Sequence, residues 1–155
     1  MAEGRRGAKV LVTSEDVDLD GVVKGMIKGA VKLGGGSLVV YTGFVKAVTK
    51  GGEVAELQVS VEDIEGLRAI ANRALGVEGV IDVFLAHRVG SLRPGDVVLV
   101  IAVTATSRHP AFKAAREILE AVKGGDVVRK VEVMANGTRR VVKAGMQPTP
   151  GCGGT

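Results

Sequence analysis

The spacing of apolar and polar residues along this chain changes repeatedly between a period near two and a period near 3.6 residues. Short apolar runs and the shorter period are typical of β-strands, whereas the longer period is typical of amphipathic helices. The pattern predicts helices at residues 20–33, from the Ser60 cap to about Leu75, and from about Pro110 to Lys123. It predicts seven strands, at residues 8–13, 37–45, 54–59, 80–87, 97–106, 127–134 and 138–142.

Residue types at the helix ends support these boundaries. The glycines at residues 34–36 are expected to end the first helix, because glycine readily takes the left-handed conformation there. Ser60 followed by Asp63 resembles a capping box at the start of the second helix. Pro110 suits the first turn of the third helix, where its missing N–H costs nothing.

Glycines and turn residues also mark irregularities in the predicted strands and the turns between them. Gly43 lies inside a strand pattern, which indicates a bulge or a close backbone approach. Residues 93–96, with the sequence Arg-Pro-Gly-Asp, have the composition of a turn. Asn136-Gly137 between two apolar runs is a strong hairpin signal, so the last two strands are predicted to pair with each other.

The order of elements is β-α-β-β-α-β-β-α-β-β, and it predicts an α+β fold with a mixed or antiparallel sheet and three helices. Strands and helices do not alternate regularly, which argues against a parallel sheet wound by helices. With 155 residues and no internal repeat, we expect a single domain over residues 1–143. The glycine- and proline-rich residues 144–155 are predicted to be a flexible tail.

Composition narrows the classes of function. Hydrophobic residues make up 46% of the chain and charged residues 25%, which is ordinary for a globular protein. The net charge of +4 is compatible with nucleic-acid binding, but the basic residues form no extended block and aromatic residues are only 3%. We therefore expect no nucleic-acid partner.

Cysteine and histidine are scarce in this chain. Its single cysteine, Cys152, lies in the predicted tail and excludes an internal disulfide. One cysteine, two histidines and no carboxylate-histidine spacing on a helix predict no metal site. The chain has no signal-peptide pattern and no apolar run of membrane-spanning length, so a cytoplasmic location without membrane association is expected.

Lys123 and Lys130 form the first candidate site. Lys123 occupies the last turn of the third predicted helix, and Gly124-Gly125 lets the backbone turn so that Lys130, early in the next strand, returns towards it. Two neighbouring ammonium groups lower each other's pKa, and a partly neutral lysine can act as a nucleophile or a base. The alternative is structural, with Lys123 complementing the helix dipole and Lys130 solvated.

The second candidate site lies at the start of the same predicted helix. Arg108 beside the backbone N–H groups of a first helical turn is a plausible anion or phosphate site, and the alternative is an ordinary surface arginine. His109 beside it is a possible proton donor or simply hydrated. His87 ends an apolar strand, where a structural hydrogen bond is expected rather than catalysis.

Five pieces of the chain, taken in order, resemble one known family, the large catalytic subunit of molybdopterin synthase. They are Y-T-G-F-V-K at 41–46, H-R-V-G-S-L-R-P-G-D at 87–96, S-R-H-P-A-F at 107–112, the pair Lys123 and Lys130, and the closing hairpin. The similarity covers about residues 8–143, and its most specific part is the run from His87 to Asp96.

The resemblance implies a homodimer of α+β subunits with a hammerhead-like element. It implies a small ubiquitin-like partner whose C-terminal Gly-Gly tail carries a thiocarboxylate. Two such tails deliver two sulfurs to cyclic pyranopterin monophosphate and form the dithiolene of molybdopterin. The partner brings the sulfur, so neither a metal nor an organic cofactor is expected.

The resemblance also assigns expected roles to individual positions. Lys123 matches the family's essential lysine near the thiocarboxylate, and Lys130 matches its second lysine. Arg108 matches an arginine that helps to hold the phosphorylated pterin. The remaining expected substrate-binding positions are Phe44, Val45, Lys46, Ser107, Val131 and Glu132.

Two of these positions depart from the family pattern. Lys46 replaces the usual arginine, which keeps the charge but loses the bidentate fork. Ser107 replaces the usual histidine and removes a proton donor. These departures motivate an alternative, in which the chain is a divergent relative that binds the carrier or a pterin without turnover.

Overall fold

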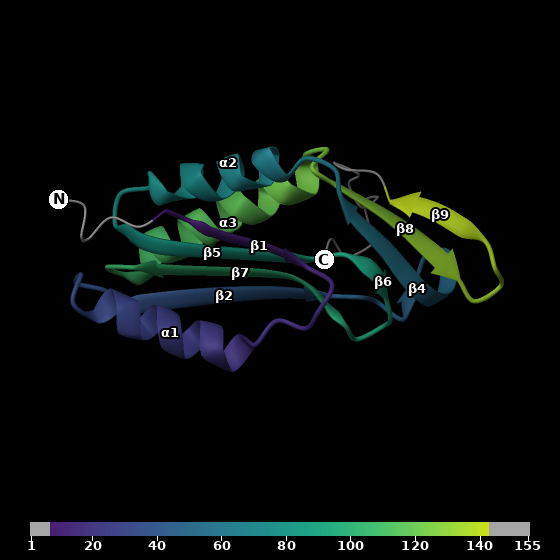
Figure 1. The fold of residues 1–155 in the computed structure, drawn as a ribbon, viewed down its shortest axis with the longest axis horizontal. Helices are drawn as coiled ribbons and strands as arrows, with labels where there is room; N and C mark the ends of the chain where they lie inside the picture. Colours follow the sequence, from purple (N-terminus) through teal and green to yellow (C-terminus); the bar gives the residue numbers. More distant parts are fainter. Residues whose placement is uncertain (1–6, 143–155) are drawn as a thin grey trace.

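Two β-sheets organise residues 7–142, the part of the chain that the computed structural model describes (Figure 1). The expected flexible tail at 144–155, with Cys152, lies outside the described residues. Along the chain the elements are β1 (Lys9–Thr13), α1 (Leu19–Val31), β2 (Ser37–Phe44), β3 (Val48–Thr49), β4 (Gly52–Val61), α2 (Ile64–Leu75), β5 (Val80–Arg88), β6 (Gly90–Leu92), β7 (Val97–Ala105), α3 (Arg108–Gly124), β8 (Val128–Met134) and β9 (Arg139–Val142).

The first sheet has four strands in the order β1-β5-β7-β2. β1 runs parallel to β5, and the other neighbours are antiparallel. Its central strands are covered on both faces, because Leu85 and Ile101 belong to the core with α2 and α3, while Phe84 and Ala102 pack with residues of α1. Burial on both faces explains why β5 and β7 read as nearly continuous apolar runs rather than as alternating ones.

The second sheet has five strands and stands at one end of the first (Figure 1). β4 is its long central strand and pairs with the short β3 and β6 and with β8, which in turn pairs with β9. β8 follows directly on the C-terminal end of α3. This connection places the end of α3 at the junction between the two sheets.

The structure confirms the α+β class, the three helices and all seven predicted strands, and it adds two strands that the pattern did not indicate. β3 and β6 have two and three residues, too few to show a period of two, and both exist only because they pair with β4. Gly43 does lie at a bulge, where the β2–β7 register shifts between Gly43 and Phe44.

The predicted start of the second helix was wrong. Asp63, not Ser60, caps α2, since its carboxylate accepts the Gly66 N–H at 2.8 Å. Ser60 still belongs to β4, and its hydroxyl donates to Glu62. A capping-box pattern places the cap at the first of its residues, but the pairing of β4 with β8 extends the strand past Ser60.

The other local signals are confirmed. α1 ends in a Schellman motif, in which the N–H of Gly35 donates to the Ala30 carbonyl at 2.9 Å and Gly34 takes a φ of 84°. The β8–β9 hairpin turns at Gly137, whose φ is 90° and whose N–H donates to the Met134 carbonyl. Asn136 keeps a negative φ, as in the three-residue loop with a glycine bulge.

His87 and Arg88 fasten the end of β5. His87 is fully buried, and its Nδ1 lies 3.0 Å from the Arg88 carbonyl oxygen, which confirms the expected structural hydrogen bond. The Arg88 guanidinium bonds to the Asp16 carboxylate at 2.8 Å and to the Ser14 carbonyl at 3.2 Å. These contacts tie the loop after β1 to the junction between the sheets.

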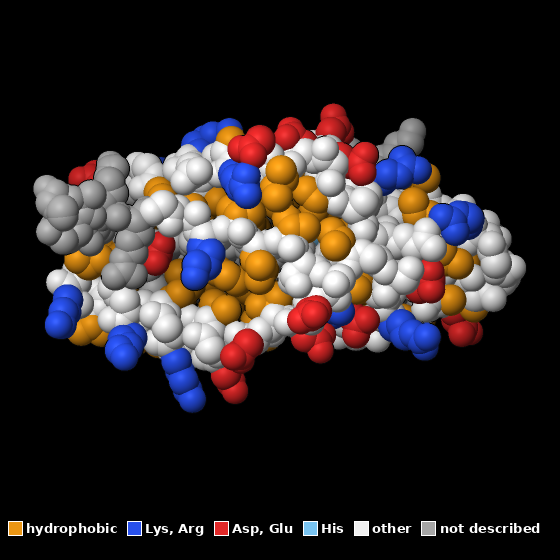
Figure 2. All heavy atoms as spheres, in the orientation of Figure 1, with side chains coloured by type: hydrophobic (Ala, Val, Ile, Leu, Met, Phe, Trp, Pro, Cys, Tyr) orange, Lys and Arg blue, Asp and Glu red, His pale blue; other side chains and the backbone are white. Residues whose placement is uncertain are grey.

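An apolar groove crosses the face drawn in Figure 2, where hydrophobic side chains gather near the middle and charged ones rim them. A cavity of about 760 Å³ lies there between α1 and the strands β1 and β5, lined in part by Val10, Leu11, Met26 and Phe84.

His87 makes the folded chain sensitive to acid. Burial lowers the pKa of His87 from 6.5 to about 4, although the bond to the Arg88 carbonyl opposes this. The unfolded chain therefore takes up this proton near pH 6.5 and the folded chain only near pH 4. We expect the free energy of unfolding to fall by about 3 kcal/mol from this residue as the pH drops from 6.5 to 4.

Urea unfolding at pH 7 and pH 4 measures this effect. The His87→Met variant lacks the titrating ring, so its loss of stability in acid should be smaller by that amount. An equal loss in the wild type and the variant contradicts the assignment.

Candidate functional site

A pocket of about 520 Å³ opens at the junction between the two sheets. Its walls come from β2 and the segment after it, the start of β7, the end of α3, and β4, β8 and β9. The charged side chains that line it are Lys46, Lys50, Lys123, Lys130, Arg140 and one carboxylate, Glu132. A concave site with an excess of cations is suited to a small anionic ligand.

The two predicted lysines meet in this pocket. Lys123 is exposed in the last turn of α3, and Lys130 is half-buried as the third residue of β8. Burial lowers the pKa of Lys130 to about 8, and the charge of Lys123 and a hydrogen bond with it act in the same direction. The structure therefore brings the lysine pair together and excludes the alternative of a fully solvated Lys130.

The turn between the lysines depends on the glycines that follow α3. Gly124 is the last residue of the helix, and Gly125 is extended with a φ of −101° and a ψ of −177°. A Cβ on Gly125 would lie 3.0 Å from the Ala121 carbonyl oxygen, so the chain passes close to the end of the helix here. This close approach returns β8 directly beneath Lys123.

Glu132 shares a face of β8 with Lys130 because successive side chains of a strand alternate. Its carboxylate forms an ion pair with Arg140 Nε at 3.7 Å and accepts a hydrogen bond from the Thr49 hydroxyl at 3.4 Å. Arg140 stands directly across from Glu132 in the β8–β9 register. Glu132 is thus engaged with Arg140, and the lysine side of the pocket keeps its positive charge.

The segment from Phe44 to Lys46 forms the rim and the apolar floor. The bulge after Gly43 turns this segment out of the sheet, so that Phe44 and Lys46 are exposed while Val45 is buried. The Val45 N–H donates to the Asp96 carbonyl, and the Val45 carbonyl accepts from the Gly95 N–H, both at 2.9 Å. These two backbone bonds to the 93–96 turn fix the rim in position.

Three of the expected substrate-binding residues do not line the pocket. Val131 is buried on the opposite face of β8. Ser107 and Arg108 are exposed at the N-terminal end of α3, whereas Lys123 is in its last turn. Fifteen helical positions separate Arg108 from Lys123, or about 22 Å along the axis. Within one chain these two cations do not share a site.

Two of the cations that line the pocket, Arg140 and Lys50, were not predicted from the sequence. Arg140 was not predicted, because the Asn136-Gly137 signal does not fix the register: a two-residue turn would place Val141 across from Glu132, whereas the observed three-residue loop places Arg140 there. Lys50 stands in the turn between β3 and β4, where no periodicity marks it. Its position depends on the hairpin that β3 and β4 form.

Among the described residues, no group of three or more histidine, cysteine or acidic side chains is arranged to hold a metal ion. Within residues 7–142, no helix is both long and apolar enough to cross a membrane. The lysines and the arginine that line the pocket can bind an anion and stabilise a developing negative charge, and Lys130, with a pKa of about 8, can exchange a proton near neutral pH.

Comparisons with known proteins show the family to which the chain belongs. The model of the MoaE protein family matches residues 12–125, well over half of the chain. The molybdopterin synthase catalytic subunit of Ralstonia nicotianae is 30% identical over 85% of this chain and 76% of its own length. That of Cereibacter sphaeroides is 30% identical over 83% of this chain and 88% of its own length.

Solved structures show the same fold. The molybdopterin biosynthesis MoaE protein from Burkholderia ambifaria is 26% identical, with a TM-score of 0.74 over 92% of this chain and 93% of that one. A protein-protein complex of subunits 1 and 2 of molybdopterin-converting factor from Helicobacter pylori gives a TM-score of 0.69. That similarity covers 96% of this chain and 98% of the other at 18% identity, which supports the fold alone.

The lowered pKa of Lys130 predicts that anion binding depends on pH. Lys130 is protonated below about pH 8 and neutral above it. Inorganic sulfate keeps a constant charge over this range, so we expect its affinity for the pocket to fall about tenfold between pH 7 and pH 9.5 as one cation is lost.

Titration of sulfate monitored by NMR at both pH values measures this change. Lys130→Arg is the matched control, because arginine stays charged throughout and should keep the affinity nearly constant. The same pH dependence in Lys130→Arg and in the wild type would show that another group is responsible.

Proposed function

This chain belongs to the MoaE protein family as a molybdopterin synthase catalytic subunit, and we propose that its pocket transfers sulfur to a phosphorylated pterin. The observation that carries the proposal is the contact between Lys123 and Lys130 inside a pocket rich in cations. The proposed substrate, cyclic pyranopterin monophosphate, is anionic. A site of five cationic side chains and one carboxylate complements that charge.

The proposed sulfur donor is the C-terminal thiocarboxylate of a small ubiquitin-like carrier. Sulfur bonds to a side-chain carbon of the pterin as the bond from that carbon to an oxygen breaks, and the oxygen leaves as water or remains on the opened cyclic phosphate. Water then attacks the carrier's carbonyl carbon, the bond from this carbon to sulfur breaks, and the carrier is left with a C-terminal carboxylate. Negative charge develops on the carbonyl oxygen while water attacks. The Lys123 ammonium is suited to stabilise this charge, and Lys130, with a pKa of about 8, is suited to take up and return the proton of the water.

The rim of the pocket supports docking of a narrow peptide tail. Phe44 and Lys46 are exposed at the mouth, and Val45, Leu57 and Leu99 line the interior. A Gly-Gly terminus lacks side chains, so it can pass such a rim and bring its last carbon to the lysines. Lys46 offers the carrier's terminal negative charge a first contact through its own charge, without the bidentate fork of an arginine.

We propose that the complete site also requires a second copy of the chain. β2 runs from Ser37, which pairs with Ala105 near the start of α3, to Phe44 at the pocket. Within the described residues no strand pairs with the outer edge of β2. Apolar surface near this edge comes from the exposed Val40 on β2. Ile27 of α1, which lines a hollow beside the strand, adds to it.

Antiparallel pairing of two β2 edges around a two-fold axis completes the site. The Ser37 end of one copy then lies beside the Phe44 end of the other, because the two strands run in opposite directions. This brings Ser107 and Arg108 of one subunit towards the lysine pair of its partner. The homodimer thereby unites cations that one chain keeps about 22 Å apart.

Replacement of Lys123 tests the catalytic role. We expect Lys123→Ala to lower the single-turnover rate of dithiolene formation about 100-fold or more, because it removes the cation proposed to stabilise the developing oxyanion. The measurement is product mass after incubation with thiocarboxylated carrier and cyclic pyranopterin monophosphate.

Lys28→Ala is the matched control, since Lys28 also occupies the last turn of a helix but lies on α1, outside the pocket. A pure helix-dipole role predicts similar small effects at both positions. Undiminished product from Lys123→Ala refutes the proposed role. Carrier binding by the wild type with no product at all would instead favour the non-catalytic alternative that Lys46 and Ser107 suggest.

Complementation between two impaired variants tests the shared site. Arg108→Ala is expected to raise KM roughly tenfold, since it removes a charge-assisted contact to phosphate. Lys123→Ala and Arg108→Ala chains co-expressed in equal amounts should recover about a quarter of the wild-type rate at low substrate, because half of the dimers carry one intact site of two. A rate no greater than the sum of the separate variants would place both residues in the same chain's site.

A further inference from the structure

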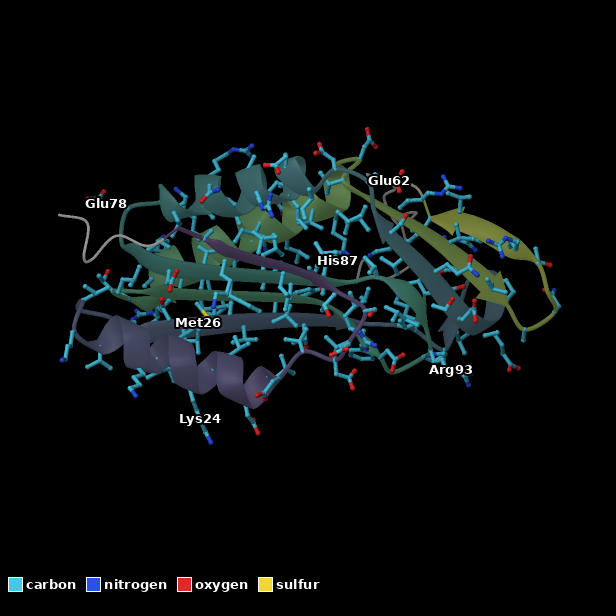
Figure 3. The ribbon with its side chains drawn as sticks, viewed as in Figure 1. Lys24, Met26, Glu62, Glu78, His87 and Arg93 are labelled. Atoms are coloured by element: carbon cyan, nitrogen blue, oxygen red, sulfur yellow. The ribbon has the colours of Figure 1, made fainter. Side chains whose placement is uncertain are left out.

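His87 is a fully buried titratable side chain that the chemistry above leaves unused. It lies at the end of β5 nearest the five-stranded sheet (Figure 3). Val83 and Leu85 precede it at intervals of two along the strand and belong to the core with α2 and α3. The ring therefore points to the same face of the sheet, which is the face that α3 covers above the pocket.

The hydrogen bond at Nδ1 fixes which nitrogen carries the proton. Nδ1 lies 3.0 Å from the Arg88 carbonyl oxygen, and a carbonyl oxygen only accepts, so Nδ1 must donate. The ring is neutral at physiological pH because burial lowers its pKa to about 4. In the neutral ring the proton on Nδ1 leaves Nε2 with a bare lone pair, which can only accept.

Nε2 is buried, and none of the described residues donates a hydrogen bond to it. A buried acceptor without a donor is unfavourable and rare, so such an atom points to a contact with a specific function. The lysine pair is the nearby source of donors. The charges of Lys130 and Lys123 both act on the ring and lower the pKa of His87, the effect of Lys130 being the larger.

The strand register places His87 next to the pocket wall. His87 stands across from Leu99 in the β5–β7 pairing, and cross-strand partners project to the same face. Leu99 lines the pocket together with Lys123 and Lys130. His87 is therefore the cross-strand neighbour of a residue that lines the pocket with both lysines.

We propose that Nε2 of His87 accepts a hydrogen bond from the Lys130 ammonium, directly or through one bridging water, and so acts as a positioning residue for sulfur transfer. The catalytic part of this inference rests on the proposed function. A lysine side chain has four rotatable bonds, and Lys123 repels its charge. An acceptor behind the pocket wall restrains the Lys130 amine while the anionic substrate approaches from the opening.

A neutral acceptor suits this pocket better than a carboxylate does. A carboxylate against Lys130 cancels the charge that attracts the phosphate, whereas a neutral imidazole holds the ammonium and leaves its charge in place. The charged groups that face Lys130 from the surrounding elements are Lys46, Lys50, Lys123, Glu132 and Arg140. Glu132 is already engaged by Arg140 and Thr49, so it does not replace His87 as the acceptor.

The pKa of Lys130 in the carrier-free chain is the direct test. An acceptor stabilises the ammonium, so its removal lowers the pKa. In His87→Met we expect the pKa of Lys130 to fall by about one pH unit. The pKa is followed by NMR of the lysine side-chain carbons, and the Lys130 signal is assigned by its loss in Lys130→Arg. His87→Gln, which keeps an acceptor near the position of Nε2, should stay close to the wild-type value.

Thr104→Val is the matched control. Thr104 is buried in β7 of the same sheet, and its hydroxyl has no partner among the described residues, but it lines a hollow beside α1 rather than the lysine pocket. This variant should leave the pKa of Lys130 unchanged. A general loss of packing would move the Lys130 pKa in both Thr104→Val and His87→Met, whereas the proposed contact moves it in His87→Met alone.

Two outcomes overturn the proposal. One is a Lys130 pKa in His87→Met equal to that of the wild type, and the other is the same fall in His87→Met and His87→Gln. If His87→Met does not fold, His87→Phe replaces it as the variant without an acceptor. None of these measurements needs a substrate, so the hydrogen bond can fail while the proposed function stands.

Turnover supplies the second readout. Under saturating thiocarboxylated carrier and pterin, His87→Met should lower kcat about tenfold with little change in KM, because a displaced Lys130 still attracts the substrate. His87→Gln should restore most of that loss. A KM effect without a kcat effect would refute the positioning role.

Discussion

The proposed function of this molecule depends on holding two ammonium groups close together at the junction of its sheets. Burial of Lys130 disfavours its charged form, and repulsion from Lys123 adds to the cost, which is why the pKa of Lys130 falls to about 8. Such a pair persists only if the backbone on both sides is fixed. α3 packs on the four-stranded sheet and β8 is paired on both edges, with β4 and β9, so neither lysine can withdraw by moving its backbone.

The same rigidity determines what the pocket offers to a ligand. Its floor is apolar, its rim is tied by backbone hydrogen bonds to the 93–96 turn, and its one carboxylate is engaged with Arg140. An incoming anion thus meets positive charge that is already oriented, and little reorganisation is needed. His87 extends this preorganisation behind the pocket wall, where a buried neutral acceptor stands beside two cations.

The length of α3 links the chemistry to assembly. A helix of 17 residues separates Arg108 at its start from Lys123 at its end, and both ends carry cations suited to a phosphorylated substrate. One chain presents these cations at opposite ends of the same sheet. In the proposed dimer, a two-fold related copy joined along β2 would bring these cations together without any change of fold, and it would also cover a sheet edge that the described residues leave open.

Much of this molecule follows from local sequence signals, since helix periodicity, glycine and proline positions and the Asn136-Gly137 turn act over a few residues. They determined the three helices, the seven main strands, the bulge at Gly43 and the proximity of Lys123 to Lys130 across a short glycine turn. Only the tertiary structure decided that the strands form two sheets, that β3 and β6 exist, and that Arg108 lies far from the lysines while Lys50 and Arg140 join them. The reason is that strand pairing and helix packing bring together residues distant in sequence, and no local period records which partners they choose.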